Sequence, residues 1–144
     1  MSENQKKRTA LITGASAGIG REMALVFAAE GFDLVLVARR EERLAALAQE
    51  VQGKYGTVSH IVVADLADPA APRALFDEMA ARHIMVDALV NNAGYTVPGH
   101  FRDTTWGDQA ALIQVMVTAV AELCHLFGPG MAARNYGRII NVAS

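Results

Sequence analysis

The chain has 144 residues, of which 52% are hydrophobic and 19% charged, and its formal net charge is -2. This composition predicts one globular domain that is long enough to bury a core. The longest basic block is the short run 5–8, so neither nucleic acid nor an anionic membrane is expected as the main partner. No stretch approaches the ~18 consecutive apolar residues that a membrane span needs.

The first eight residues are polar and lack the apolar run of a signal peptide. We expect a disordered tail over 1–8 and one domain over 9–144. The single cysteine, Cys124, excludes an internal disulfide, and its apolar helical surroundings predict an unreactive thiol. A reducing cytoplasm is therefore the expected location. The histidines share no metal-ligand spacing, so no metal is expected; they are His60, His83, His100 and His125.

Apolar runs of strand length alternate with amphipathic segments of helix length. The expected strands are 10–13, 33–38, 58–63, 88–91 and 138–143. The run over 33–38 is apolar without alternation, which is typical of a parallel strand that is buried on both faces. The β-α alternation with right-handed crossovers predicts an α/β fold, a Rossmann-type doubly wound parallel sheet with strand order 3-2-1-4-5.

Four helices connect these strands. The first is expected over 19–30, with Ile19, Met23, Val26 and Phe27 as its apolar stripe, and the second over 41–54. Asp68 and Pro69 are expected to cap and open the third. The fourth starts at Thr104 or Thr105 and runs to about Phe127, where 128–130 (Gly-Pro-Gly) ends or kinks it. Its predicted stripe is Leu112, Val115, Met116, Ala119, Leu123 and Leu126.

Three glycines follow the first strand in the pattern G-x-x-x-G-x-G. Gly14 lets the chain turn sharply, Gly18 lets the backbone approach a ligand, and Gly20 lets the helix pack on the sheet. The helix start offers free N–H groups and a positive dipole end to an anion, typically a pyrophosphate. A glycine-rich turn without a ligand is the alternative interpretation of this stretch alone.

The second strand ends in Ala38-Arg39-Arg40, with no acidic residue at its tip. A domain that prefers NAD usually places a carboxylate there, which would repel the 2′-phosphate of NADP. A guanidinium can pair with that phosphate, which predicts a preference for NADP of roughly ten- to hundredfold. Arg39 is the first choice for this contact, while Arg40 and Ser16 could assist. The alternative is a solvated helix start.

Four stretches together resemble the short-chain dehydrogenase/reductase family in order and spacing. They are Thr13-Gly14-x-x-x-Gly18-x-Gly20, Asp65-Leu66, Asn91-Asn92-Ala93-Gly94, and Arg138-Ile139-Ile140-Asn141-Val142-Ala143-Ser144. The resemblance covers nearly the whole chain past Arg8. It implies a nicotinamide cofactor across the strand ends and hydride transfer between that cofactor and a small alcohol or carbonyl substrate.

The resemblance also implies roles for single residues. Asp65 would meet the adenine amino group, with Leu66 beside the ring, although Asp65 could instead be a turn residue. Asn92, Ala93 and Gly94 would line the cofactor ribose, and Ile19 belongs to the cofactor contacts of the glycine loop. Ser144 stands where the family places the catalytic serine that binds the substrate oxygen; a polar strand end is the alternative.

Two departures bear on catalysis. The family's catalytic tyrosine and lysine, four residues apart, are missing: Tyr55, Tyr95 and Tyr136 are followed at that offset by Ser59, Gly99 and Ile140. In the family this pair lies beyond the serine, so we expect the domain to be cut off at Ser144 and these 144 residues alone to be inactive. Met116 occupies the place of an asparagine that holds a water in the family's proton relay.

Several alternatives stay open. A dinucleotide-binding module without chemistry, such as a redox sensor, is favoured by the two departures. A sugar-nucleotide epimerase or dehydratase usually spaces its glycines G-x-x-G-x-x-G, unlike this chain. Tyr95, Val97 and Phe101 could line an apolar substrate pocket or pack the loop. The long helix resembles one that forms a subunit interface in the family, so a homodimer or homotetramer is expected.

Overall fold

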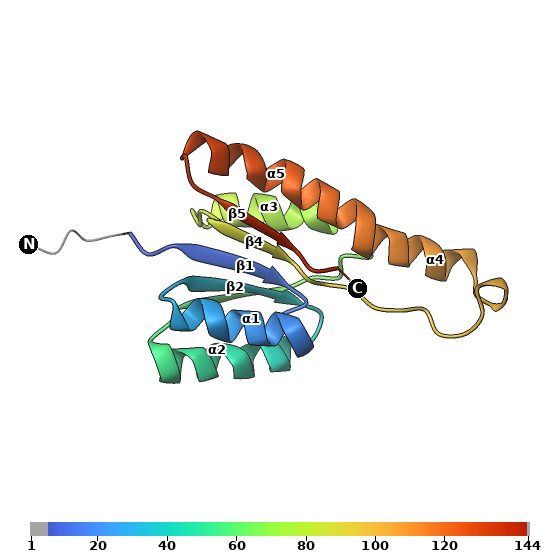
Figure 1. Ribbon diagram of the computed structural model, residues 1–144, viewed down its shortest axis with the longest axis horizontal. Helices are drawn as coiled ribbons and strands as arrows, with labels where there is room; N and C mark the ends of the chain where they lie inside the picture. Colours follow the sequence, from blue (N-terminus) through green and yellow to red (C-terminus); the bar gives the residue numbers. More distant parts are fainter. Residues whose placement is uncertain (1–5, 144) are drawn as a thin grey trace, which may run out of the picture.

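The computed structural model describes residues 6–143 and has a parallel five-stranded sheet with helices on both faces (Figure 1). The strand order β3-β2-β1-β4-β5 confirms the predicted doubly wound sheet. The strands are β1 (Thr9–Thr13), β2 (Asp33–Ala38), β3 (Ser59–Val63), β4 (Ala88–Asn91) and β5 (Arg138–Asn141). The helices are α1 (Gly18–Ala29), α2 (Glu41–Tyr55), α3 (Ala71–Ala81), the 3₁₀ turn η1 (Phe101–Asp103), α4 (Trp106–Ile113), the π-helical segment η2 (Gln114–Thr118) and α5 (Ala119–Ala133).

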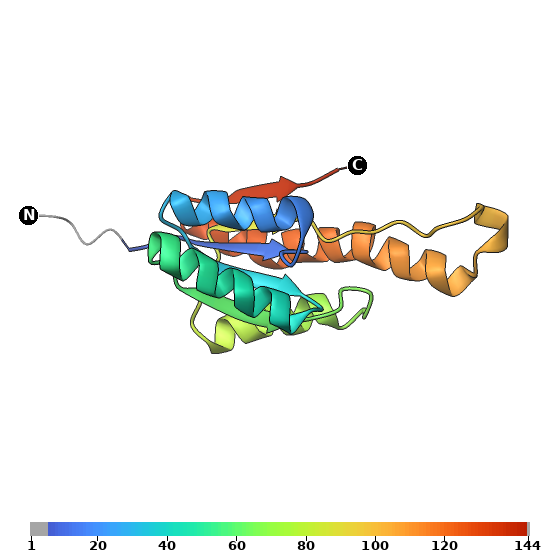
Figure 2. The ribbon, with the colours of Figure 1, turned by 90° about the horizontal axis from the view of Figure 1, so that it is seen from below.

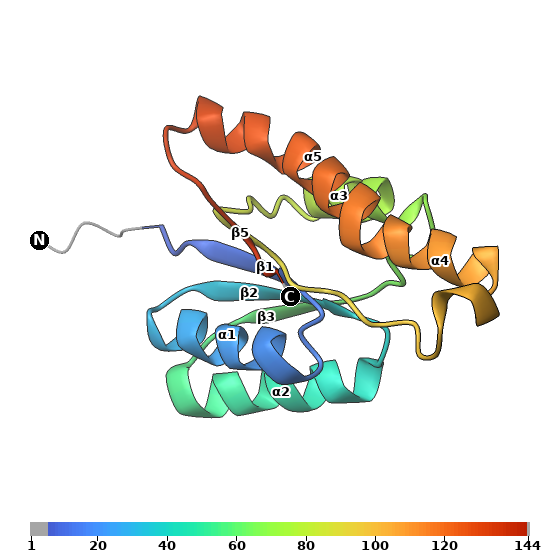
Figure 3. The ribbon, with the colours of Figure 1, turned by 45° about the vertical axis from the view of Figure 1, so that its right-hand side comes forward.

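Each central strand buries both of its faces, because successive side chains point to opposite sides of a strand. In β1, Ile12 packs into the core between the sheet and the α1–α2 layer, whereas Leu11 packs toward α3 and α5. Figure 3 shows α1 and α2 below the sheet and α3 and α5 above it. The continuous apolar runs of the sequence follow from this two-sided burial.

Helix α1 rests on the sheet through small residues rather than through its large ones. Gly20, Ala24 and Ala28 are its buried positions, four residues apart. Ile19 and Val26, which we expected in the apolar stripe, are 60% and 62% exposed, so that part of the prediction is wrong. The small face lets the helix axis approach the strands closely.

Helix α3 begins later than the sequence predicts. Ala70 is its N-cap residue, without a side-chain cap, and Pro72 lies in its first turn. Asp68 instead accepts a hydrogen bond from the Ala70 N–H at 2.9 Å, which makes a turn ahead of the helix. The predicted cap at Asp68 and Pro69 is therefore wrong, while Leu75 and Met79 are buried in the core.

The long helical segment runs from α4 through η2 and α5 to Ala133. The prediction that it ends near Phe127 is wrong, because Pro129 lies inside α5. A proline has no N–H, so Pro129 leaves one carbonyl of the preceding turn without its helical hydrogen bond. Because Pro129 is exposed, water can bond to that carbonyl. The buried positions along the segment recur every four residues and are Val115, Ala119, Leu123, Phe127 and Met131.

The segment Trp106–Ala133 also qualifies our expectation about membranes. It has 28 residues and contains an 18-residue window of mean hydropathy 1.8, enough in length and composition to cross a bilayer. Gln114, Thr118 and Glu122 interrupt this segment, so it is not a run of ~18 consecutive apolar residues, and the expectation about such a run is not contradicted. Length and composition alone do not separate a membrane span from a core helix, and α5 packs against α3 and the sheet. In Figure 2, α4 and the loop before it project beyond the carboxyl ends of the strands.

Candidate functional site

A cleft of about 390 Å³ opens at the carboxyl ends of the strands. Its walls are the loops that follow β1, β2, β3 and β4, together with one residue of η2, Val115. The predicted cofactor residues that line it are Gly14, Ser16, Gly18, Ile19, Arg39, Arg40, Asp65, Leu66, Asn92, Ala93 and Gly94. The topology thus brings together segments that are distant in the chain; Thr13 and Ala93, for example, are hydrogen-bonded although they lie 80 residues apart. Ser144, the predicted catalytic serine, lies outside the described residues.

Each of the three glycines that follow β1 is required for a different structural reason. Gly14 has a φ of +64°, and a Cβ there would lie 2.8 Å from Asn92 Nδ2. A Cβ on Gly20 would lie 2.3 Å from the Gly14 carbonyl oxygen, so the third glycine lets the helix meet its own loop. Gly18 has a φ of +57° and open space around its missing Cβ, which leaves its backbone bare toward the cleft.

Thr13 holds the floor of the cleft together, a role that the sequence analysis missed. Its side chain is only 1% exposed. Its hydroxyl accepts hydrogen bonds from the backbone N–H groups of Asn92 and Ala93, both at 3.0 Å, and donates to the Val90 carbonyl at 3.4 Å. The Asn92 amide donates back to the carbonyls of Thr13 and Gly14, each at 3.2 Å. A buried hydroxyl at the end of a central strand is the signal that could have revealed this role.

A second polar contact links β4 to the edge strand β5. The Asn91 amide donates to Asn141 Oδ1 at 2.9 Å and to Cys124 Sγ at 3.4 Å. The Val142 N–H donates to the Asn91 carbonyl at 3.0 Å and extends the β4–β5 pairing by one bond. Asn91 therefore braces the sheet beneath the cleft, while Asn92 faces the glycine loop.

The start of α1 is open to an anion. Its N-cap residue is Ala17, which provides no side-chain cap, and its first turn holds no acidic residue. The first N–H groups of a helix have no partner within the helix, and the dipole places partial positive charge there. Gly18 and Ile19, the first residues of α1, both line the cleft. This combination is typical of a phosphate-binding helix start.

The rim of the cleft beyond β2 is basic. The Arg40 guanidinium crosses from the start of α2 to the glycine loop, where it donates to Ser16 Oγ at 3.1 Å. Arg39 also lines the cleft, and both arginines are exposed. The structure thus pairs Arg40, rather than our first choice Arg39, with Ser16. A guanidinium and a hydroxyl side by side form a donor pair for a phosphate group.

Asp65 is the one carboxylate among the described residues that line the cleft. Its Oδ1 accepts a hydrogen bond from the Ala67 N–H at 3.0 Å, which is the turn role of the alternative interpretation. Leu66 is buried and packs with Val115 and Ala119 of the long helix. Asp65 therefore shapes the loop after β3, and Leu66 ties that loop to the opposite wall.

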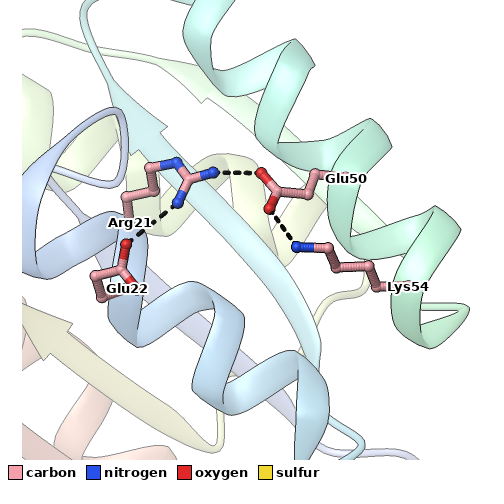
Figure 4. Close-up of polar contacts among 4 residues, drawn as sticks. All are labelled: Arg21, Glu22, Glu50 and Lys54. Atoms are coloured by element: carbon pink, nitrogen blue, oxygen red, sulfur yellow. Dashed lines mark hydrogen bonds and ion pairs between the residues drawn. The ribbon is translucent and has the colours of Figure 1, made fainter.

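An ion-pair network holds α1 against α2, and Figure 4 shows its members. Glu50 of α2 pairs with Arg21 of α1 and, at 2.8 Å, with Lys54 of its own helix. Arg21 also contacts Glu22 at 3.2 Å. The Lys54 hydrogen bond, supported by the Arg21 charge, lowers the pKa of Glu50 below its ordinary value of 4.5, and Glu50 in turn raises the pKa of Lys54.

Met116 lies beside the cleft on the π-helical segment. Its side chain contacts Gly94, where a Cβ would lie 3.3 Å from Met116 Cε. A thioether offers no hydrogen-bond donor and only a weak acceptor, so it cannot replace an amide that holds a water. Among residues 6–143, no group of three or more His, Cys, Asp and Glu side chains is arranged to hold a metal ion.

Comparison with known proteins adds to this geometry. The sequence profile of the family described as short chain dehydrogenase matches residues 8–144. A very-long-chain 3-oxoacyl-CoA reductase of Laccaria bicolor is 38% identical over 97% of this chain and 42% of its own length.

Two solved structures show the same fold. One is a short-chain dehydrogenase from Sphingobium yanoikuyae in complex with NADPH, with a TM-score of 0.87 and 38% identity over 95% of this chain and 53% of that one. The other is L-sorbose reductase from Gluconobacter frateurii, complexed with NADPH and L-sorbose. Its TM-score is 0.88, and it is 35% identical over 96% of this chain and 52% of its own. The chain therefore spans about half the length of the relatives it matches.

Proposed function

Since this chain belongs to the short-chain dehydrogenase family, we propose that its cleft binds NADP(H) in preference to NAD(H) for hydride exchange with an alcohol or carbonyl compound. The observation that carries the cofactor preference is the contact between Arg40 and Ser16 at the rim of the cleft. No acidic side chain among the described residues stands at the tip of β2, where it would repel a 2′-phosphate. The NADPH complexes of two structural neighbours support the same cofactor.

The described residues fit a dinucleotide. The uncapped start of α1 would receive the pyrophosphate, and the bare backbone of Gly18 would allow its close approach. Arg40 and Ser16 would donate to the 2′-phosphate, while Asp65 and Leu66 would meet the adenine. Asn92, Ala93 and Gly94 would line the ribose on the floor that Thr13 holds rigid.

When bound, the nicotinamide ring supplies or accepts the hydride. The contribution of this chain is to bind and orient that cofactor at the strand ends. In the proposal, Ser144 binds the substrate oxygen and stabilises charge that develops on it. Because the sequence holds no Tyr-x-x-x-Lys, we propose that these 144 residues alone bind the cofactor without turning it over.

A second candidate function is a dinucleotide-binding module without chemistry. The observation that favours it is Met116, whose side chain fills the space over Gly94 with a group that cannot relay protons. Assay of the longest chain that the gene encodes separates the two candidates. NADPH oxidation with a ketone supports the oxidoreductase, and tight binding without any turnover supports the module.

The experiment that tests the cofactor proposal is a fluorescence titration of the purified protein with NADPH and NADH. We expect both to bind at one site per chain and NADPH to bind about tenfold more tightly. Equal affinities would contradict the preference, and no binding of either would contradict the dinucleotide site itself.

A further inference from the structure

A second cavity, of about 380 Å³, adjoins the cofactor cleft. It lies between the loop after β4 and the helical segment α4–η2. We call it the loop groove; its lining residues are Tyr95, Thr96, Val97, Gly99, Phe101, Thr104, Gln109, Leu112 and Met116. Gly99 has a φ of +98°, a left-handed conformation that lets the loop turn over the groove.

Two polar side chains of the loop groove, Thr104 and Gln109, bond to the groove itself. The Thr104 hydroxyl donates to the Phe101 carbonyl at 2.7 Å and accepts from the Gln109 amide at 2.9 Å. These bonds use the Thr104 hydrogen and one Gln109 donor within the wall. The ring and aliphatic groups of Tyr95, Val97 and Leu112 remain to face a ligand. Such a lining favours an apolar group over a polyol.

The loop groove adjoins the cofactor cleft. Tyr95 lines both cavities. Two consecutive residues of the π-helical segment divide them, because Val115 lines the cleft and Met116 lines the groove. The contact between Met116 and Gly94 forms the partition. A methionine side chain is flexible and can adapt to a neighbouring ligand, and π-helical turns often occur at functional sites.

We propose that the loop groove binds the unbranched alkyl or acyl chain of a ketone substrate, whose carbonyl then lies beside the cofactor cleft. This inference rests on the proposed function, and it deepens that proposal by naming the substrate class. The occupant is an apolar chain because the groove adjoins the cleft and most of its side chains present carbon, from Tyr95, Val97, Phe101, Leu112 and Met116. Met116 then separates the cofactor from the chain of the substrate.

The test uses purified protein in which the methionines carry ¹³C-labelled methyl groups, with the Met116 signal identified by its absence in Met116→Leu. The probes are 2-decanone and 2-butanone, which differ by six methylenes, each added with and without NADPH. We expect 2-decanone to shift the Met116 signal in a saturable manner and to bind at least tenfold more tightly than 2-butanone, since two buried methylenes already give about this ratio.

A matched pair of variants localises the binding. Leu112→Gln places an amide in the groove and should weaken 2-decanone binding about tenfold. Ile113→Gln makes the same kind of change at the next residue, which is 44% exposed and does not line the groove, and should leave the affinity unchanged. NADPH affinity should be the same in both variants, which confirms that each is folded.

Three other results would contradict the inference. If 2-decanone leaves the Met116 signal unmoved, or if both variants lose affinity equally, the groove does not bind the chain. If the signal moves with protein concentration and not with ketone, a second copy of the chain covers the groove. Failure of NADPH to bind would refute the proposed function separately, and the titrations without cofactor would still decide whether the groove binds an alkyl chain.

Discussion

Replacement of Arg40 by alanine should weaken NADPH binding and leave NADH binding nearly unchanged. In the structure the Arg40 guanidinium lies 3.1 Å from Ser16 Oγ at the exposed rim of the cleft. A hydrogen bond to a charged group contributes about 1.5–3 kcal/mol, and solvent screening at this rim favours the lower end of that range. About 1.5 kcal/mol corresponds to a roughly tenfold weaker affinity for NADPH. The assay is a fluorescence titration with each cofactor at low and at high ionic strength.

Arg43→Ala is the matched control, because Arg43 is an exposed arginine of α2 that does not line the cleft. Its removal should change neither affinity. Arg39→Asp should weaken NADPH binding and improve NADH binding, since Arg39 lines the same rim. The reasoning is refuted if Arg40→Ala weakens both cofactors equally, or if added salt affects NADH as much as NADPH.

Three further predictions concern stability. Gly56→Ala should lower the free energy of unfolding by about 1–2 kcal/mol, because its φ of +67° alone disfavours a side chain. Gly14→Ala, at nearly the same φ, should lower it more and abolish cofactor binding, because its Cβ would meet backbone and an amide within 3 Å. Thermal melts compare the two stabilities, and a cofactor titration compares the two affinities. In urea unfolding, Thr13→Val should lower the free energy of unfolding by about 1–3 kcal/mol for each backbone N–H that loses its hydrogen-bond acceptor. Thr57→Val removes a buried hydroxyl that has no hydrogen-bond partner, so it should leave that free energy unchanged or raise it. Because the pKa of Glu50 is lowered in the folded state, its ion pairs stabilise the fold fully above pH 4.5 and lose this effect as the pH falls through the folded-state pKa. The difference in stability between the unchanged protein and Glu50→Gln should therefore vanish in acid. A difference that stays constant with pH would contradict the role of these ion pairs.

Much of the fold could be predicted because burial on both faces of a parallel strand leaves a plain signal in the sequence. Buried apolar runs mark the central strands β1, β2 and β4, and the alternation of strands with helices indicates a parallel sheet, whereas the edge strand β5 is exposed at all four of its residues. The same reasoning failed for α1, where the residues that touch the sheet are small. A stripe of Gly20, Ala24 and Ala28 carries almost no hydrophobic signal beside Ile19 and Val26, although close packing requires it.

Other features depend on contacts that no local pattern contains. Pro129 was expected to end or kink its helix, but the helix runs past it to Ala133. The contact between Arg40 and Ser16 joins two loops 24 residues apart, and neither loop alone shows which arginine turns toward the glycines. The role of Thr13 likewise needs the loop after β4 as its partner. The predicted roles of Ser144 and Asp65 toward substrate and adenine stay predictions.

The most direct test of the central claim compares adenosine 2′,5′-bisphosphate with adenosine 5′-monophosphate by calorimetry, because the two ligands differ only in the 2′-phosphate. A cleft whose rim recognises that phosphate through Arg40 and Ser16 predicts about tenfold tighter binding of the bisphosphate, and loss of this advantage in Arg40→Ala. Equal affinities of the unchanged protein for the two ligands would contradict the account, since they would show that the basic rim does not bind the 2′-phosphate.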